Sequence, residues 1–180
     1  MRLLASNTTA LGVDIQEKFV PHISKYDQML DRIRMLIQGL QILDIKIAVT
    51  EQNPQKLGPT VSSVEELLKN FNPIEKIEFS CYDSVDYKSW LDQNPCQNIL
   101  LFGIETHVCV LQTAVDLKQA GYNPVVVEDA VSSRSDENKA IAFKRFDLEH
   151  VMVTSVESVL FELLRSFSNP IAKRILQLVK

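Results

Sequence analysis

Three side chains far apart in the sequence could together attack a carbonyl group: Cys109, Asp14 and Lys76. A thiol becomes a nucleophile when a base removes its proton, a carboxylate can be that base, and an ammonium group can hold both anions. Each residue alone has a simpler explanation. A free cysteine usually packs as a small apolar residue, an acid after a strand often forms a turn, and a lone lysine is usually solvated. As a set they predict nucleophilic catalysis, provided that the fold brings them together.

The segment around Cys109 favours a reactive thiol. If Thr106 is the N-cap of the helix that follows the strand 98–102, Cys109 is the third residue of that helix. The positive end of the helix dipole would then favour the thiolate, and unpaired backbone N–H groups at the same turn could bind an oxyanion. We therefore expect Cys109 to have a lowered pKa and to react faster than Cys81 or Cys96.

Short apolar runs alternate with helical patterns along the whole chain, which is typical of a mostly parallel sheet between two layers of helices. Ligands of such a sheet bind beyond the carboxyl ends of its strands, and Asp14 and Cys109 lie at two of these ends. Capping patterns begin helices at Ser24, Ser63 and Thr154. About six strands are expected, at 10–15, 45–50, 77–82, 98–102, 125–127 and 151–153, with helices at 24–40, 63–68, 84–91, 103–120, 133–146, 154–164 and 171–180.

The composition is that of one α/β domain spanning 1–180. Hydrophobic residues make up 46% and charged residues 23% of the chain, which suits a folded core without metal or disulfide support. Lys and Arg number 19 against 23 Asp and Glu, a net charge of −4, so few cations are available to neutralise nucleic-acid phosphates. No apolar run approaches the roughly 20 residues of a membrane span. We expect neither nucleic acid nor a membrane as a partner.

The cysteines indicate a reducing compartment, because three widely spaced thiols do not suit a disulfide framework. The polar residues 6–9 follow Met1 closely and leave no apolar core for a secretory signal. We therefore expect an intracellular, cytoplasmic protein, although the sequence leaves an organellar location open.

Three strings of the sequence resemble the isochorismatase-like cysteine hydrolases: VDIQEKF at 13–19, KIEFS at 76–80 and GIETHVCV at 103–110. Proteins of that superfamily carry an aspartate at the end of the first strand, a K-x-x-F-S segment, and a cysteine at the start of the helix after a G-[IV]-[EA]-T motif. The strings VTEQNPQKLGPTV at 49–61 and TSVESVLFELL at 154–164 are most similar to the small isochorismatase-domain proteins. The resemblance spans essentially the whole chain, with the three residues in the family's order.

The resemblance implies a role for each residue of the set. Cys109 would attack a carbonyl carbon and form a thioester. Asp14 would take the thiol proton and later give it to the departing amine, while Lys76 would stabilise both the carboxylate and the thiolate. Similar proteins hold a cis peptide bond at the position of Ile104 and Glu105, which would aim the backbone N–H groups of Glu105 and Cys109 at the oxyanion.

Two departures from the wider superfamily narrow the expected function. Metal-dependent nicotinamidases carry a D-x-H-x-x-H cluster after the second strand, whereas this chain has EQNP at 51–54, and its histidines (His22, His107 and His150) lie far apart. We therefore expect no metal and no organic cofactor. Isochorismatases that cleave a vinyl ether typically lack this cysteine, so Cys109 favours acyl transfer.

Residues near the expected strand ends are candidates for substrate contacts. Two phenylalanines flank the acid and the ammonium and could form an apolar wall, or could be ordinary core aromatics. Polar residues and a tyrosine near the same mouth could contact substrate or only form turns, and a histidine two residues before the thiol points roughly 200° away from it, as a rim or interface residue would. The candidates are Gln16, Phe19, Glu51, Phe79, Tyr82 and His107.

The sequence thus predicts a hydrolase of a small amide or related acyl substrate that works through a Cys109 thioester. The family also implies a homo-oligomer whose subunits close one another's active-site mouth, and the apolar residues of the last helix could form a contact stripe. Two alternatives stay open: a binding or regulatory protein that does not turn over substrate, and a vinyl-ether hydrolase that uses Asp14 without the thiol. Nuclease activity is disfavoured by the acidity and the missing metal ligands. The sequence does not identify the substrate.

Overall fold

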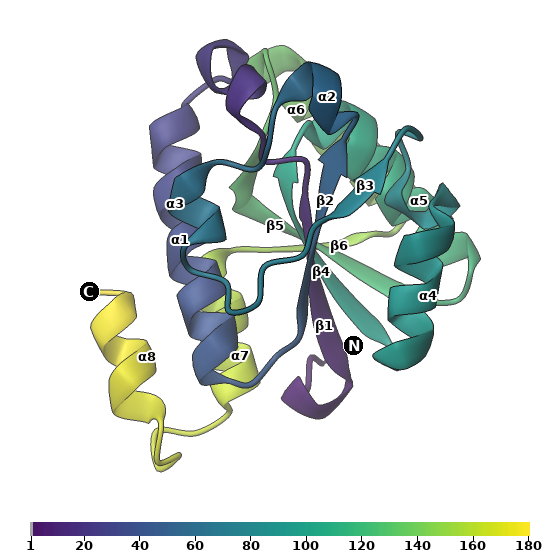
Figure 1. Ribbon diagram of the computed structural model, residues 1–180. Coiled ribbons are helices and arrows are strands. Elements are labelled where there is room, and N and C mark those ends of the chain that lie inside the picture. The colour runs from purple at the N-terminus through teal and green to yellow at the C-terminus, as the bar shows by residue number, and fades with distance from the viewer. Residues whose placement is uncertain (1) are drawn as a thin grey trace.

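The sheet that positions the candidate site has six strands, all parallel, in the computed structural model, which describes residues 2–180 (Figure 1). The strand order is β3-β2-β1-β4-β5-β6, so the order reverses between the central neighbours β1 and β4. In sheets of this kind a ligand cleft forms at that reversal. The expected six-stranded α/β fold is confirmed. The strands are β1 (Thr8–Val13), β2 (Ile47–Gln52), β3 (Ile74–Lys76), β4 (Asn98–Ile104), β5 (Asn123–Ser132) and β6 (Met152–Thr154).

Helices cover both faces of the sheet, as Figure 1 shows. One layer contains α1 (Tyr26–Ile42), α3 (Ser62–Glu65), α7 (Val156–Leu164) and α8 (Ala172–Leu178). The other layer contains α4 (Val85–Gln93), α5 (Leu111–Gln119) and α6 (Asp136–Leu148). The short helix α2 (Pro54–Leu57) follows β2. The remaining helical turns are η1 (Ala5–Asn7), η2 (Glu17–His22), η3 (Cys81–Asp83) and η4 (Thr106–Val110).

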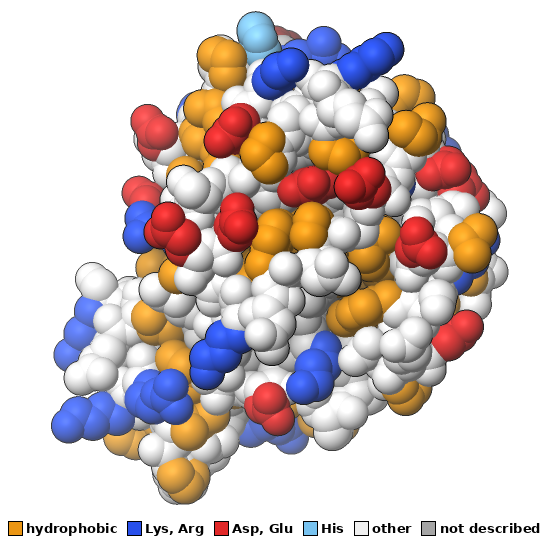
Figure 2. Space-filling model, in the orientation of Figure 1, with side chains coloured by type: hydrophobic (Ala, Val, Ile, Leu, Met, Phe, Trp, Pro, Cys, Tyr) orange, Lys and Arg blue, Asp and Glu red, His pale blue; other side chains and the backbone are white. Residues whose placement is uncertain are grey.

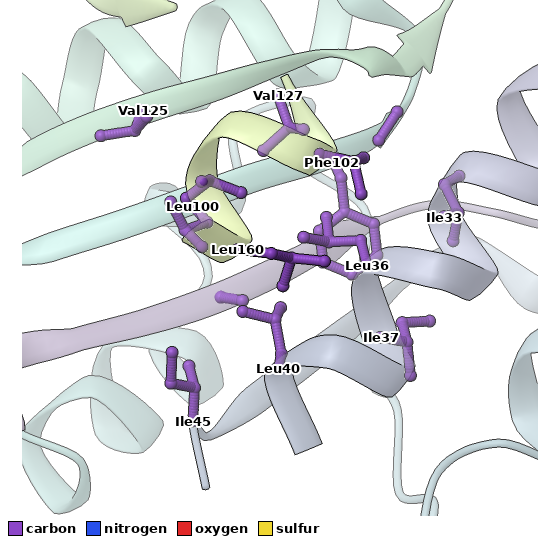
Figure 3. Packing of buried hydrophobic residues seen from close by; sticks show 14 of the residues in the cluster. Ile33, Leu36, Ile37, Leu40, Ile45, Leu100, Phe102, Val125, Val127 and Leu160 are labelled. Carbon is purple, nitrogen blue, oxygen red and sulfur yellow. The ribbon is translucent and has the colours of Figure 1, made fainter. Parts of the chain in front are cut away.

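The core on the first face forms where α1 and α7 pack on β4 and β5 (Figure 3). Helix α1 presents Ile33, Leu36, Ile37 and Leu40 to it, and their spacing puts all four on one side of a helix. Gly39 lets α7 approach closely, because a Cβ atom at this position would lie 2.4 Å from the Leu160 Cδ2 atom. The sheet is thereby held between two packed helical layers, and its strand ends are fixed in place.

The third strand in the sequence differs from its prediction. A strand was expected at 77–82, but β3 ends at Lys76, and Ile77 is 68% exposed. After β3 the chain curls around the Lys76 side chain, whose Nζ donates hydrogen bonds to the backbone oxygens of Glu78 and Phe79 at 3.1 and 3.4 Å. These carbonyls are therefore used by an ammonium group, and the apolar run does not extend the sheet.

The three expected helix caps are also wrong. Helix α3 begins at Ser62, after Val61, so Ser63 lies inside it. Helix α1 begins after Lys25, which has a left-handed backbone (φ 52°), while the Ser24 hydroxyl donates to an Asp136 carboxylate oxygen on α6 at 2.8 Å. Helix α7 is capped by Ser155 instead of Thr154. The hydroxyl of Ser24 thus bonds to a residue distant in sequence, which a local capping pattern does not reveal.

The last helix packs within the chain. Ile175 of α8 is fully buried, and α8 contacts both α1 and α7, so the apolar stripe expected to face another subunit is largely used internally. Basic side chains gather over α8, at the lower left of Figure 2, away from α2 and the carboxyl ends of the strands. No helix within residues 2–180 is long and apolar enough to cross a membrane.

Candidate active site

The three residues of the predicted set lie at the carboxyl ends of neighbouring strands. Asp14 directly follows β1, Lys76 is the last residue of β3, and Cys109 lies in the helical turn η4 that follows β4. Asp14 is fully buried and has a left-handed backbone (φ 51°), which turns the chain sharply at the strand end. The sheet order places β1 beside β4 and separates β1 from β3 only by β2. The fold therefore brings these distant segments together.

Asp14 and Lys76 form a buried ion pair. The Lys76 Nζ lies 2.7 Å from the Asp14 Oδ2 atom, and both side chains are essentially inaccessible to solvent. Burial lowers the pKa of Lys76, but the negative charge of Asp14, the nearby thiols and the hydrogen bond to Asp14 together outweigh that effect and raise it. Because an unpaired buried charge is very costly, each member of this pair requires the other. Lys76 is therefore a fixed ammonium group beside the carboxylate.

The Cys109 thiol is buried near the charged pair of Asp14 and Lys76. Burial, followed by the negative charge of Asp14, raises the thiol pKa well above its ordinary value, while the positive charge of Lys76 opposes this. The expectation of a lowered pKa is therefore wrong. Its physical basis is also different, because Cys109 lies in a π-helical turn instead of the first turn of an α-helix.

A close contact between the two central strands positions the η4 turn. Gly103 on β4 pairs with Val13 on β1 and has a φ of 112°; a Cβ atom here would lie 2.2 Å from the Val13 carbonyl oxygen. The next peptide bond, between Ile104 and Glu105, is cis. The Glu105 carboxylate then accepts hydrogen bonds from the backbone N–H and the Nε of Arg134, both at 3.0 Å. The chain before Cys109 is thus held by β1 on one side and by the segment after β5 on the other.

Two polar candidates for substrate contacts hold the backbone instead. The Gln16 amide is fully buried, accepts from the Gln52 N–H at 2.8 Å, and donates to the carbonyl oxygens of Gln52 and Gly58 at 3.1 and 2.7 Å. The Glu51 Oε1 atom accepts from the Thr60 N–H and hydroxyl at 2.7 and 2.8 Å. Both residues tie the loop after β2 to the strand ends. The expectation that Gln16 faces the mouth is wrong, because backbone partners occupy its amide.

The aromatic candidates do not form one wall. Phe19 packs against the core on the α1 face, whereas Phe79 is 57% exposed. The Tyr82 ring makes an edge contact with Tyr122, with a centroid distance of 6.2 Å. Since Tyr122 immediately precedes β5, at the amino end of that strand, Tyr82 points away from the site and its expected contact with substrate is wrong.

His107 lies partly buried at the edge of the η4 turn. Its Nδ1 atom hydrogen-bonds with the Ser133 hydroxyl at 3.0 Å. This contact joins η4 to the segment after β5, in the same way as the pair between Glu105 and Arg134. The role of His107 as a rim residue and not the base stays a prediction.

The sequence analysis missed two polar residues on β2 that contact the set directly. The Thr50 hydroxyl donates to the Asp14 Oδ1 atom at 2.7 Å, and the Gln52 Oε1 atom accepts from the Lys76 Nζ at 2.7 Å. They are two positions apart, so they lie on the same face of the strand. A run of three polar residues, 50–52, at the end of an otherwise apolar and buried strand was the signal that could have identified them.

A second buried thiol lies next to the site. The Cys81 sulfur is 3.6 Å from the Thr50 hydroxyl oxygen, and burial, together with the charge of Asp14, raises the pKa of this thiol to about 11. Cys81 is completely inaccessible to solvent. It is therefore a packing residue at the floor of the site, in line with its expected structural role.

The surface has a cavity beside the site and a groove away from it. A cavity of about 310 Å³ is bordered by Lys76, by α2 and by the start of α4. A groove of about 1040 Å³ lies elsewhere, between α1, α6 and the end of β5. Within residues 2–180, no three His, Cys, Asp or Glu side chains converge as the ligands of a metal ion would.

The chain is similar to known proteins over nearly its whole length. Residues 8–158 match the family described as isochorismatase domain. The chain is 34% identical over 179 residues to isochorismatase domain-containing protein 2A of Mus musculus, an alignment that covers 99% of this chain and 85% of that protein.

Solved structures share the whole fold. A structure described as MAR1 ribonuclease from Caenorhabditis elegans is 37% identical, with a TM-score of 0.93, over 99% of this chain and 92% of that one. The YcaC gene product from Escherichia coli, described as an octameric hydrolase of unknown specificity, is 20% identical, with a TM-score of 0.90, over 96% of this chain and 86% of that one. At that identity the second likeness concerns the fold alone.

Proposed function

The chain belongs to the isochorismatase domain family, and from that premise we propose that it is a cysteine hydrolase of small amides or related acyl compounds. One observation carries the proposal: a buried carboxylate, Asp14, lies 2.7 Å from the ammonium group of Lys76, and both charges act on the buried Cys109 thiol nearby. A nucleophile, a base and a group that orients the base thus share one site, which is the arrangement that covalent catalysis requires.

In the proposed reaction, Asp14 removes the thiol proton as the Cys109 sulfur attacks the carbonyl carbon. The carbon–nitrogen bond then breaks, the amine leaves with the proton held by Asp14, and a thioester remains on Cys109. Water attacks this thioester while Asp14 accepts its proton, and the acid product leaves as the thiol is restored. The raised pKa of Cys109 supports this order, because the thiol keeps its proton until the substrate arrives.

The remaining parts of the site follow from the same proposal. Lys76 orients the Asp14 carboxylate through their contact. The backbone N–H groups of Glu105 and Cys109 bind the oxyanion of the tetrahedral intermediate. The reaction needs no organic cofactor and no metal, and the substrate is a small molecule. The family suggests a homo-oligomer, and assembly of this chain stays a prediction.

The test is a panel of small carboxamides assayed for ammonia release by the wild-type protein and two cysteine variants. Cys109→Ala should lower kcat/KM on the order of 10³-fold or more, because it removes the nucleophile. Cys96→Ala is the matched control, since Cys96 is a free thiol bonded to Thr9 at the amino ends of β1 and β4. This control should retain wild-type turnover.

Three other outcomes of these assays would contradict the proposed function. Turnover that survives Cys109→Ala would indicate acid catalysis by Asp14, as in the cleavage of a vinyl ether. Ligand binding without turnover across the panel would indicate a binding protein. Because one structural relative is described as a ribonuclease, a labelled single-stranded RNA is included; cleavage that requires Cys109, without amide hydrolysis, would contradict the proposed substrate class.

A further inference from the structure

Strand β2 contacts both charged members of the site. Thr50 donates its hydroxyl hydrogen to Asp14 Oδ1 at 2.7 Å, and Gln52 accepts a hydrogen bond from Lys76 through its side-chain oxygen, also at 2.7 Å. Both β2 residues are buried. Because β2 lies between β1 and β3 in the sheet, side chains two positions apart on one strand reach Asp14 after β1 and Lys76 at the end of β3.

The orientation of the Gln52 amide is fixed by its other contacts. Its Nε2 donates to the Ile77 carbonyl oxygen at 2.6 Å, which requires the Oε1 atom to be the one that faces Lys76. The Gln52 backbone N–H is held by the Gln16 side chain. The contacts of Gln52 therefore hold its side-chain oxygen toward the ammonium group, and the amide cannot turn its NH₂ group there.

The hydrogen-bonding capacity of Lys76 is used up within the protein. An ammonium group has three N–H donors, and four oxygen atoms surround this one: Asp14 Oδ2, Gln52 Oε1 and the carbonyls of Glu78 and Phe79. Lys76 thus has no donor left for a substrate. It acts on the reaction through its own positive charge beside Asp14. The position of that charge depends on the residues that hold the ammonium group.

The Asp14 carboxylate is constrained in the same way. Thr50 occupies one of its oxygens and Lys76 the other. An ionised carboxylate offers about four lone-pair positions, so two donors fix its plane and still leave positions for the thiol proton. Both donors also neutralise part of the negative charge that faces Cys109.

We propose that Thr50 and Gln52 are positioning residues of the reaction, Thr50 acting through Asp14 and Gln52 acting through Lys76. This inference rests on the proposed cysteine hydrolase function. Without either contact, more uncompensated negative charge remains on Asp14, and a thiolate beside it is disfavoured. Cys109 should then react more slowly although the fold is unchanged.

The experiment measures the rate at which iodoacetamide alkylates Cys109 in the full chain, from neutral to mildly alkaline pH, with mass mapping of each cysteine. Thr50→Val removes the donor at constant shape, and Gln52→Met removes the acceptor at similar length. Each should slow alkylation of Cys109 about tenfold or more, while the rate at Cys96 is unchanged. Thr50→Ser, which keeps the hydroxyl, should restore the Cys109 rate to within about twofold of wild type.

Gln55→Met is the matched control, because Gln55 is an exposed residue of α2, and it should leave the rate unchanged. Thermal unfolding shows that each variant is folded, and Thr50→Ala replaces Thr50→Val if the latter is not. Wild-type reactivity of Cys109 in folded Thr50→Val and Gln52→Met would overturn the inference. So would equal slowing by Thr50→Val and Thr50→Ser, because packing alone would then explain both.

The alkylation assay uses no substrate, so it separates the two proposals. A silent carboxamide panel with slowed alkylation in Thr50→Val contradicts the hydrolase and supports only the effect of Thr50 on the reactivity of Cys109. Active hydrolysis with unchanged alkylation in the variants contradicts the positioning roles alone.

Discussion

At the scale of single residues, the site combines a buried salt bridge with a buried thiol. Asp14 and Lys76 neutralise each other, and burial and the charge of Asp14 raise the pKa of the Cys109 thiol. The helix-dipole argument for a thiolate fails here because burial and a neighbouring carboxylate both favour the neutral form. A neutral thiol beside a base suits a mechanism in which proton transfer accompanies attack. In the proposed reaction Asp14 takes the thiol proton only as the sulfur attacks, so the thiol stays neutral between turnovers.

Buried thiols should make the protein less stable at alkaline pH. An unfolded cysteine ionises near pH 8.5, whereas burial raises the pKa of Cys81 to about 11 and that of Cys109 further. Above pH 8.5 the folded state therefore holds protons that the unfolded state has lost, and the free energy of unfolding falls as pH rises. Each thiol contributes a slope of about 1.4 kcal/mol per pH unit within its window. Urea denaturation at a series of pH values measures this slope.

Cys81→Ala provides the control for that prediction. The variant should weaken the decline in stability between about pH 8.5 and pH 11, because the folded and unfolded chains then differ by one fewer proton. An unchanged slope in Cys81→Ala would show that other groups cause the loss of stability.

At the scale of elements, the site depends on how strands end. Strand β1 ends where Asp14 turns the chain through a left-handed backbone conformation. Strand β3 ends where the carbonyl groups that follow Lys76 accept hydrogen bonds from its ammonium group. Strand β4 ends at Ile104, one residue after Gly103, and the peptide bond between Ile104 and Glu105 is cis. The ends of β1 and β4 are also packed together, and this contact sets the position of η4. Altering it should therefore affect function as well as stability.

Gly103→Ala should destabilise the protein and impair the site. The added Cβ would lie 2.2 Å from the Val13 carbonyl oxygen, and the φ of 112° is unfavourable for alanine. We expect a loss of more than about 4 kcal/mol in the free energy of unfolding, the range of severe core changes, measured by urea denaturation.

Gly121→Ala separates the two causes. Gly121 also has a positive φ, of 92°, but nothing within 4 Å of an added Cβ. It should lose only about 1 kcal/mol. Equal losses in the two variants would show that backbone conformation alone, and not the contact between β1 and β4, accounts for the effect.

At the scale of the whole molecule, a parallel sheet lies between two helical layers, and the candidate site lies at the carboxyl ends of its strands. The reversal of strand order between β1 and β4 separates Asp14 from Cys109 by one strand spacing. Helix α8 closes the α1 and α7 layer instead of extending outward. The stability of that layer should therefore govern the stability of the protein as a unit, through residues that are remote from the site.

Leu160→Ala should test this dependence. Leu160 is completely buried between α7, α1 and the sheet and contacts Gly39 closely (Figure 3). Truncation should lower the free energy of unfolding by about 2–5 kcal/mol, measured by urea denaturation. Phe167→Ala, at an 82% exposed position, should change it by less than about 0.5 kcal/mol. A small loss in Leu160→Ala would mean that the layer rearranges to fill the space.

The sequence by itself determined the fold class, the location of most elements and the three residues of the set. Apolar runs and helical spacing are local properties, and they report burial directly. Local patterns misplaced β3 and three helix caps. For β3 and α1 the reason is that Lys76 and Ser24 make contacts that such patterns do not include.

Only the tertiary structure decided which residues contact one another in the site. That Gln16 holds a loop, that Tyr82 faces the opposite end of the sheet, and that Thr50 and Gln52 fix the charged pair all depend on which strands are neighbours. The ionisation of Cys109 was decided in the same way, because desolvation and the nearby carboxylate exist only once the chain has folded. Residue types define what chemistry is available, and the electrostatic environment built by distant segments sets the protonation state in which it begins.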